Sequence, residues 1–112
     1  MIPVRKKIVA LPRLNNLTPT MESTALKLME EAGELAQAIG KLRGMSGERC
    51  VADQGEALNH ITRELLDVAQ TAVSMMFVLE EHYGVNIEKA LDEHVDKLME
   101  KGYLKESLKS KV

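Results

Sequence analysis

The chain has 112 residues, the size of a single domain, and its 17 acidic and 15 basic residues leave a formal net charge of -2. This balance argues against a general nucleic-acid binder, because such proteins are normally basic. A lone cysteine, Cys50, allows no intrachain disulfide framework, and the sequence shows neither a membrane span nor an export signal, so we expect a cytoplasmic protein with no membrane partner.

The first 20 residues predict an irregular arm followed by the start of a helix. Residues 1–17 have no helical period and are interrupted by prolines. Thr18 can cap a helix, and Pro19 suits its first position. Gly40 and Gly44 bracket the expected end of this helix. Its predicted apolar stripe consists of Met21, Ala25, Leu28, Ala32, Leu35 and Ile39.

After a predicted loop over residues 43–55, a second helix is expected from about Glu56 to about Tyr83. A helix that is apolar over most of its circumference is buried on more than one side. In a chain this short, we expect another subunit to cover the second side. The main apolar face is Leu58, Ile61, Leu65, Val68, Ala69, Ala72, Met76 and Leu79, and the strip beside it is Leu66, Val73 and Phe77.

A third helix is predicted from Asn86, which can cap it, to Gly102, which ends it. Gly84 suits a left-handed cap at the end of the second helix. The pattern predicts an all-α fold in which the first two helices form an antiparallel hairpin, with a third helix, assembled as a helical-bundle dimer or tetramer. The helical domain covers residues 18–103, and the Lys- and Ser-rich residues 104–112 are expected to form a flexible tail.

Two acidic clusters, Glu30–Glu34 and Glu64–Asp67, lie inside the two long helices, and each puts two carboxylates three residues apart on one side. Helical projection places Glu31 roughly 90° from the centre of the apolar stripe and Glu64 at the flank of its own. Glu34 and Glu64 are both roughly 12 Å from the loop, so an antiparallel hairpin brings them level. One Glu-rich face alone is usually solvated surface. Four level carboxylates would repel one another unless a divalent cation joined them.

The pattern E-E-x-x-E followed by E-x-x-D resembles the MazG-like branch of the all-α nucleoside triphosphate pyrophosphatases, over about residues 20–103. The resemblance implies an enzyme that hydrolyses a nucleoside triphosphate to a monophosphate and pyrophosphate. It also implies Mg²⁺ as cofactor, with Mn²⁺ as an alternative, and a homodimer or homotetramer. Carried over by position, the metal ligands would be Glu31, Glu34, Glu64 and Asp67, and Glu30 would orient or deprotonate the attacking water.

Candidate phosphate contacts are basic residues one helical turn apart. Many family members carry a basic, Asn-containing segment on a later helix, and here Lys97 and Lys101 occupy the corresponding stretch without a matching Asn. Lys27, one turn before Glu31, is a further candidate, although a solvated lysine face explains all three equally simply. This departure keeps an alternative open: a catalytically weak or inactive oligomeric module that binds a nucleotide or a protein. A purely structural oligomerisation protein is the third possibility.

Overall fold

The computed structural model describes residues 4–44 and 53–105, and within these residues the chain forms helices and no strand. The helices are α1 (Met21–Arg43), α2 (Gln54–Tyr83) and α3 (Ile87–Glu100). The all-α prediction is confirmed. Cys50 and residues 106–112 of the predicted tail lie outside the described residues.

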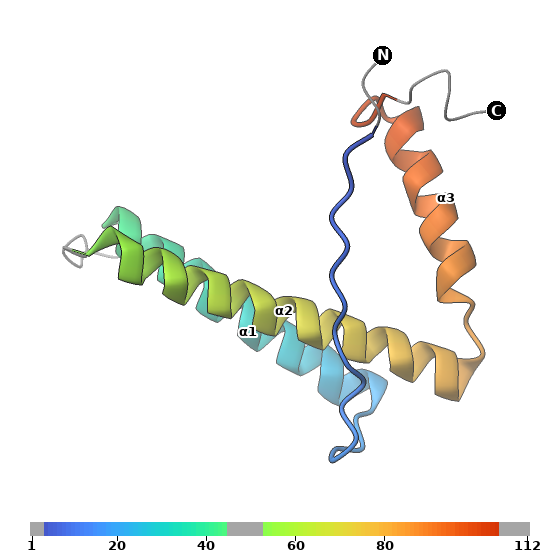
Figure 1. Cartoon of the computed structure of the whole chain (residues 1–112). Helices are drawn as coiled ribbons and strands as arrows, with labels where there is room; N and C mark the ends of the chain where they lie inside the picture. The colour runs from blue at the N-terminus through green and yellow to red at the C-terminus, as the bar shows by residue number, and fades with distance from the viewer. Residues whose placement is uncertain (1–3, 45–52, 106–112) are drawn as a thin grey trace.

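Helices α1 and α2 run antiparallel and pack along each other, whereas α3 extends away from the pair (Figure 1). The least exposed positions of α1 and α2 recur after alternately three and four residues, which is the spacing of a coiled-coil seam. On α1 these positions are Met21, Thr24, Leu28, Glu31, Leu35, Ala38 and Leu42, and on α2 they are Ala57, Ile61, Glu64, Val68, Thr71, Met75 and Val78.

The predicted stripe of α1 is wrong in half of its members. Ala25, Ala32 and Ile39 are exposed, and Thr24 and Ala38, which the stripe omitted, are buried in their place. Apolar residues occupy two neighbouring faces of α1, so the helical period could not tell which face meets α2. The structure places the other face on the outside of the single chain.

The predicted start of α1 at Thr18 and Pro19 is also wrong. Thr20 is the N-cap, because it forms a reciprocal pair with Ser23 that a cap at Thr18 could not form. The backbone N–H of Ser23 donates to Thr20 Oγ1 at 3.0 Å, and the N–H of Thr20 donates to Ser23 Oγ at 2.9 Å. Pro19 therefore precedes the cap.

The other helix ends follow the expected chemistry more closely. Helix α2 begins two residues earlier than predicted, because the Asp53 side chain accepts from the N–H of Glu56 at 3.1 Å and caps it. Gly44 and Gly84 end α1 and α2 with φ of 69° and 66°, a conformation that favours glycine. Asn86 caps α3 as predicted.

Much apolar surface of the helix pair is uncovered in the single chain. The radius of gyration is 17.9 Å, whereas a compact domain of this length would have about 13 Å. No described helix is long and apolar enough to cross a membrane. The large hydrophobic side chains of α1 and α2 that are at least 41% exposed are Leu26, Met29, Ile39, Leu58, Leu65, Leu66, Met76 and Tyr83.

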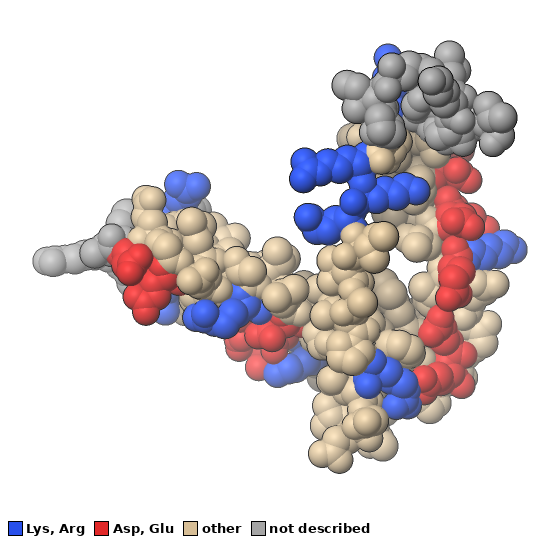
Figure 2. Space-filling model, in the orientation of Figure 1, with Lys and Arg blue, Asp and Glu red and all other residues tan. Residues whose placement is uncertain are grey.

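The N-terminal arm, residues 4–19, has no helix or strand but is attached to α2. The Arg13 guanidinium makes two hydrogen bonds to the Glu81 carboxylate, at 2.6 and 2.8 Å. The Gln70 amide donates to the Pro12 carbonyl at 2.8 Å. Figure 2 shows basic side chains gathered at the end of the arm that is distant from the helix pair, and acidic side chains in a row along α3. These hydrogen bonds hold the arm where it crosses α2 (Figure 1).

Candidate functional site

The two acidic clusters meet in the hairpin, at the equal height that the sequence predicts. Glu31 and Glu34 of α1 and Glu64 of α2 can each offer one carboxylate oxygen, with the three oxygens within 4.8 Å of one another. We call these three residues the carboxylate group. Asp67 lies outside the group but lines a cavity together with Glu31. The hairpin therefore brings together three of the four predicted metal ligands and places the fourth beside them.

The members of the carboxylate group differ in burial, and the projection of Glu31 to the flank of the stripe is wrong. Glu31 is 6% exposed because it occupies a seam position between Leu28 and Leu35. The Glu64 side chain, on the facing helix, is 15% exposed, whereas Glu34 is exposed. Placing carboxylates in a helix seam costs free energy unless each finds a partner.

Only one oxygen of each buried carboxylate has a nearby partner among the described residues. Lys27 Nζ lies 3.0 Å from Glu31 Oε1 and 3.6 Å from the exposed Glu30. His60 Nε2 lies 3.8 Å from Glu64 Oε1. The second oxygens, Glu31 Oε2 and Glu64 Oε2, are buried without a hydrogen-bond partner. Buried oxygens left in this way are destabilising and call for an explanation, such as an ion that binds them.

The pKa shifts around the carboxylate group show the same unfavourable crowding of negative charge. The pKa of Glu34 is raised, first by the negative charge of Glu31, then by partial desolvation beside the helix seam, and then by the charges of Glu64 and Glu30. The pKa of Lys27 is raised by its hydrogen bond to Glu31 and by the charges of Glu30 and Glu31. An all-oxygen donor set that repels itself matches the preference of a hard divalent cation such as Mg²⁺.

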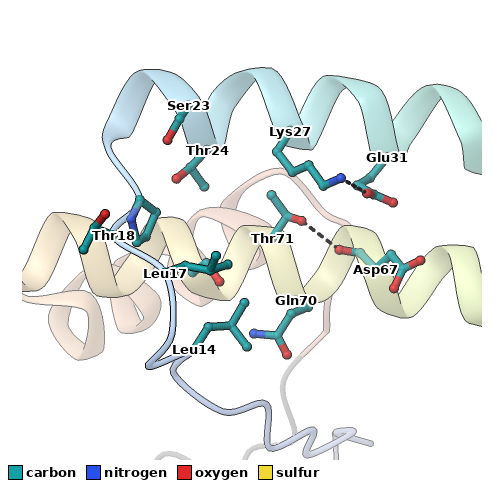
Figure 3. A pocket seen from close by; sticks show the side chains of 12 residues that line it. Leu14, Leu17, Thr18, Ser23, Thr24, Lys27, Glu31, Asp67, Gln70 and Thr71 are labelled. Carbon is teal, nitrogen blue, oxygen red and sulfur yellow. Dashed lines mark hydrogen bonds and ion pairs between the residues drawn. The ribbon is translucent and has the colours of Figure 1, made fainter.

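A cavity of about 560 Å³ opens beside the carboxylate group, between the arm and the helix pair. Its charged lining residues, Lys27, Glu31 and Asp67, lie together at one end (Figure 3). Neutral residues of the arm, α1 and α2 line the rest. The volume is typical of a small-molecule site.

The remaining predicted residues lie around this centre at different distances. Lys27 points to the carboxylate group and lines the cavity. Glu30 is one position away on the exposed side of α1, beside Lys27. Lys97 lies in the last turn of α3 and Lys101 at its C-cap, on the helix that extends away from the pair (Figure 1). Within one chain, these two lysines are not brought to the carboxylate group.

Sequence reasoning missed the neutral polar residues of the cavity. Gln70, Thr71 and Ser74 follow Asp67 by three, four and seven residues, so they share its side of α2. Thr24 precedes Glu31 by seven residues on α1 and lies in the same wall. A signal was therefore present, because helical spacing from each acidic cluster leads to a polar residue. The course of the arm, which closes the cavity, left no such signal.

A comparison with models of known protein families matches residues 19–102 to the MazG nucleotide pyrophosphohydrolase domain. The chain belongs to this family. The matched region begins just before α1, ends just after α3, and contains both acidic clusters. No curated protein and no solved structure matches the chain significantly. Membership agrees with the resemblance that the E-E-x-x-E and E-x-x-D pattern indicated.

Substituting Glu34 tests whether the carboxylates repel one another. The raised pKa means that the folded chain holds a proton more tightly than the unfolded chain. The stability of the metal-free protein therefore falls as the pH rises through that pKa. With chelator at pH 7, Glu34→Gln should melt a few degrees above the wild type. Added Mg²⁺ should raise the melting temperature of the wild type and leave that of Glu34→Gln unchanged.

Thermal melts with chelator and with Mg²⁺ measure both effects. Glu93→Gln, the same substitution on the exposed surface of α3, is the control and should respond to Mg²⁺ like the wild type. An equal Mg²⁺ response in Glu34→Gln would contradict the assignment of Glu34 to a cation site.

Proposed function

We propose that this protein hydrolyses a nucleoside triphosphate between its α and β phosphates, releasing a nucleoside monophosphate and pyrophosphate with Mg²⁺, or alternatively Mn²⁺, as cofactor. One observation carries the proposal: Glu31 Oε2 and Glu64 Oε2 are buried without a hydrogen-bond partner among the described residues. They belong to a carboxylate group whose oxygens come within 4.8 Å of one another, in a chain of a nucleotide pyrophosphohydrolase family. The adjoining cavity is large enough for a small molecule and has a lysine at its charged end.

Glu31, Glu34, Glu64 and Asp67 are the proposed metal ligands. Glu31 and Glu64 sit in the seam, where helix packing restricts their side chains before any ligand arrives. Asp67 lines the cavity into which Glu31 also projects, which supports its assignment as the fourth ligand. Held by these residues, Mg²⁺ would supply positive charge for the phosphate oxygens and would lower the pKa of a water molecule bound to it.

The neighbouring residues have proposed roles in positioning. Lys27 already partners one oxygen of Glu31, and a phosphate entering the cavity would offer its ammonium group a second anionic partner. Glu30, exposed beside Lys27, is proposed to orient or deprotonate the attacking water. In-line attack on phosphorus needs positioning and charge stabilisation more than a nucleophilic side chain.

Product analysis tests the proposed reaction. We expect phosphorus NMR of a panel of nucleoside triphosphates with Mg²⁺ to show pyrophosphate and the monophosphate, and no orthophosphate. Chelator should stop the reaction. Glu64→Gln should slow it by roughly a hundredfold or more, because the substitution removes a charge that holds the cofactor. Glu93→Gln should keep wild-type activity.

Other outcomes separate the alternatives. No pyrophosphate from any nucleotide would contradict the proposed reaction. A rise in melting temperature with nucleotide but without turnover would favour the alternative of a binding module, since a ligand that binds the folded state stabilises it. Release of orthophosphate would show cleavage at another phosphate.

We also propose that the protein works as a homodimer or homotetramer. The exposed apolar side chains of α1 and α2, such as Met29 and Leu58, have no cover in the single chain. Exposed apolar area of this extent marks an interaction surface. Assembly would also give Lys97 and Lys101 a route to a carboxylate group, because α3 of one subunit is free to approach the helix pair of another.

Sedimentation analysis tests the assembly. The wild type should have a mass of at least two chains of 12.5 kDa. Leu58→Glu should shift the mass toward one chain, because it buries a charge in the interface. Asn59→Glu, at the adjacent exposed position, should leave the mass unchanged. A monomeric wild type at micromolar concentration would contradict the proposal.

A further inference from the structure

The cavity beside the carboxylate group has two chemically different halves. One end carries the charged residues Lys27, Glu31 and Asp67, and the other is formed by neutral side chains (Figure 3). Leu14 and Leu17 of the arm give the neutral half an apolar wall, and α1 and α2 give it hydroxyl and amide groups. None of the lining residues is aromatic. Thr24 and Glu31 lie seven positions apart, which is about 10 Å along α1, so the cavity is elongated from its neutral end to its charged end.

The wall formed by the arm is fastened at two points. Arg13 bonds Glu81 through two nitrogens, a geometry that fixes the guanidinium plane as well as its distance. The Pro12 carbonyl accepts from the Gln70 amide. Because a carbonyl can only accept, this bond also establishes which end of the Gln70 amide is nitrogen. Gln70 lines the cavity, and its amide oxygen has no hydrogen-bond donor among the described residues.

Ser74 supplies an unused hydroxyl in the same wall. Hydroxyl groups on helices commonly bond the carbonyl four residues earlier. Thr24 does so to Thr20 at 2.6 Å, and Thr71 does so to Asp67 at 2.9 Å. Ser74 Oγ is buried and has no hydrogen-bond partner among the described residues. A buried hydroxyl without a partner calls for an explanation, and a ligand in the cavity that Ser74 lines would supply the missing partner.

We propose that the nucleoside part of the substrate binds in the neutral half of the cavity, against the arm, and hydrogen-bonds to Ser74 and Gln70. The arm, held by Arg13, is then the wall that determines which nucleosides fit. This inference rests on the proposed function, because it places the triphosphate at the carboxylate group. Recognition uses apolar contact and hydrogen bonds in place of aromatic stacking.

Steady-state kinetics of Ser74→Ala test the hydrogen bond. Loss of one neutral hydrogen bond should raise KM for nucleoside triphosphates about three- to tenfold with kcat retained. Inorganic triphosphate, which has no nucleoside, should inhibit the wild type and Ser74→Ala with the same inhibition constant. Thr62→Ala removes a hydroxyl from α2 outside the cavity and should leave KM unchanged. An unchanged KM in Ser74→Ala would overturn the assignment of Ser74.

The arm is tested by breaking and then restoring its attachment. Arg13→Gln should raise KM unequally across a panel of nucleosides, and thus change their ranking. The exchange of charges in Arg13→Glu with Glu81→Arg should return the wild-type ranking. An Arg13→Gln variant that keeps the wild-type KM for every nucleoside would overturn the role of the arm.

Binding separates failure of this inference from failure of the proposed function. If the wild type releases no pyrophosphate, the protein is titrated by calorimetry in two separate experiments with Mg²⁺ present. One uses an α,β-methylene nucleoside triphosphate and the other uses inorganic triphosphate. Tighter binding of the nucleotide analogue, lost in Ser74→Ala, would support the nucleoside site without turnover. Equal binding of the two compounds would overturn it, whether or not hydrolysis occurs.

Discussion

Glu31 and Glu64 occupy seam positions that a helix pair normally fills with apolar residues, and each leaves one buried oxygen without a hydrogen-bond partner among the described residues. The helices bring the charges together because Leu28, Leu35, Ile61 and Val68 pack on either side of them. The packing of these apolar side chains thus holds the carboxylates close together although their negative charges repel one another. The same opposition raises the pKa of Glu34, and it makes a divalent cation the simplest partner for the group.

The remaining parts of the chain can be understood from this centre. The arm crosses α2 near the carboxylate group and closes a cavity whose charged end is the group itself. Helix α3 and the outer faces of α1 and α2 contribute little to the packing of the single chain. A chain of this size with so small a core gains stability from oligomerisation. The cavity and the exposed apolar face are therefore proposed to serve substrate binding and assembly, with α3 of a second subunit as the element that could connect the two.

The sequence predicted the elements better than the side-chain environment. The hydrophobic period of the sequence and the chemistry of helix capping predicted the three helices and the equal height of the acidic clusters. They also predicted the caps at Gly44, Gly84 and Asn86. The burial of Glu31 could not be predicted, because α1 has two apolar faces and the period does not choose between them. The arm was equally inaccessible to sequence reasoning, since its course depends on contacts between residues distant in the chain, such as Arg13 with Glu81.

The most direct test of the account is a calorimetric titration of Mg²⁺ into metal-free wild type and Glu64→Gln, with circular dichroism to verify that both are helical. We predict saturable binding to the wild type and no measurable binding to Glu64→Gln, because the substitution removes a charge from one of the two seam carboxylates. Absence of Mg²⁺ binding to the folded wild type, or equal binding to the two proteins, would contradict the claim that the seam carboxylates form a cation site.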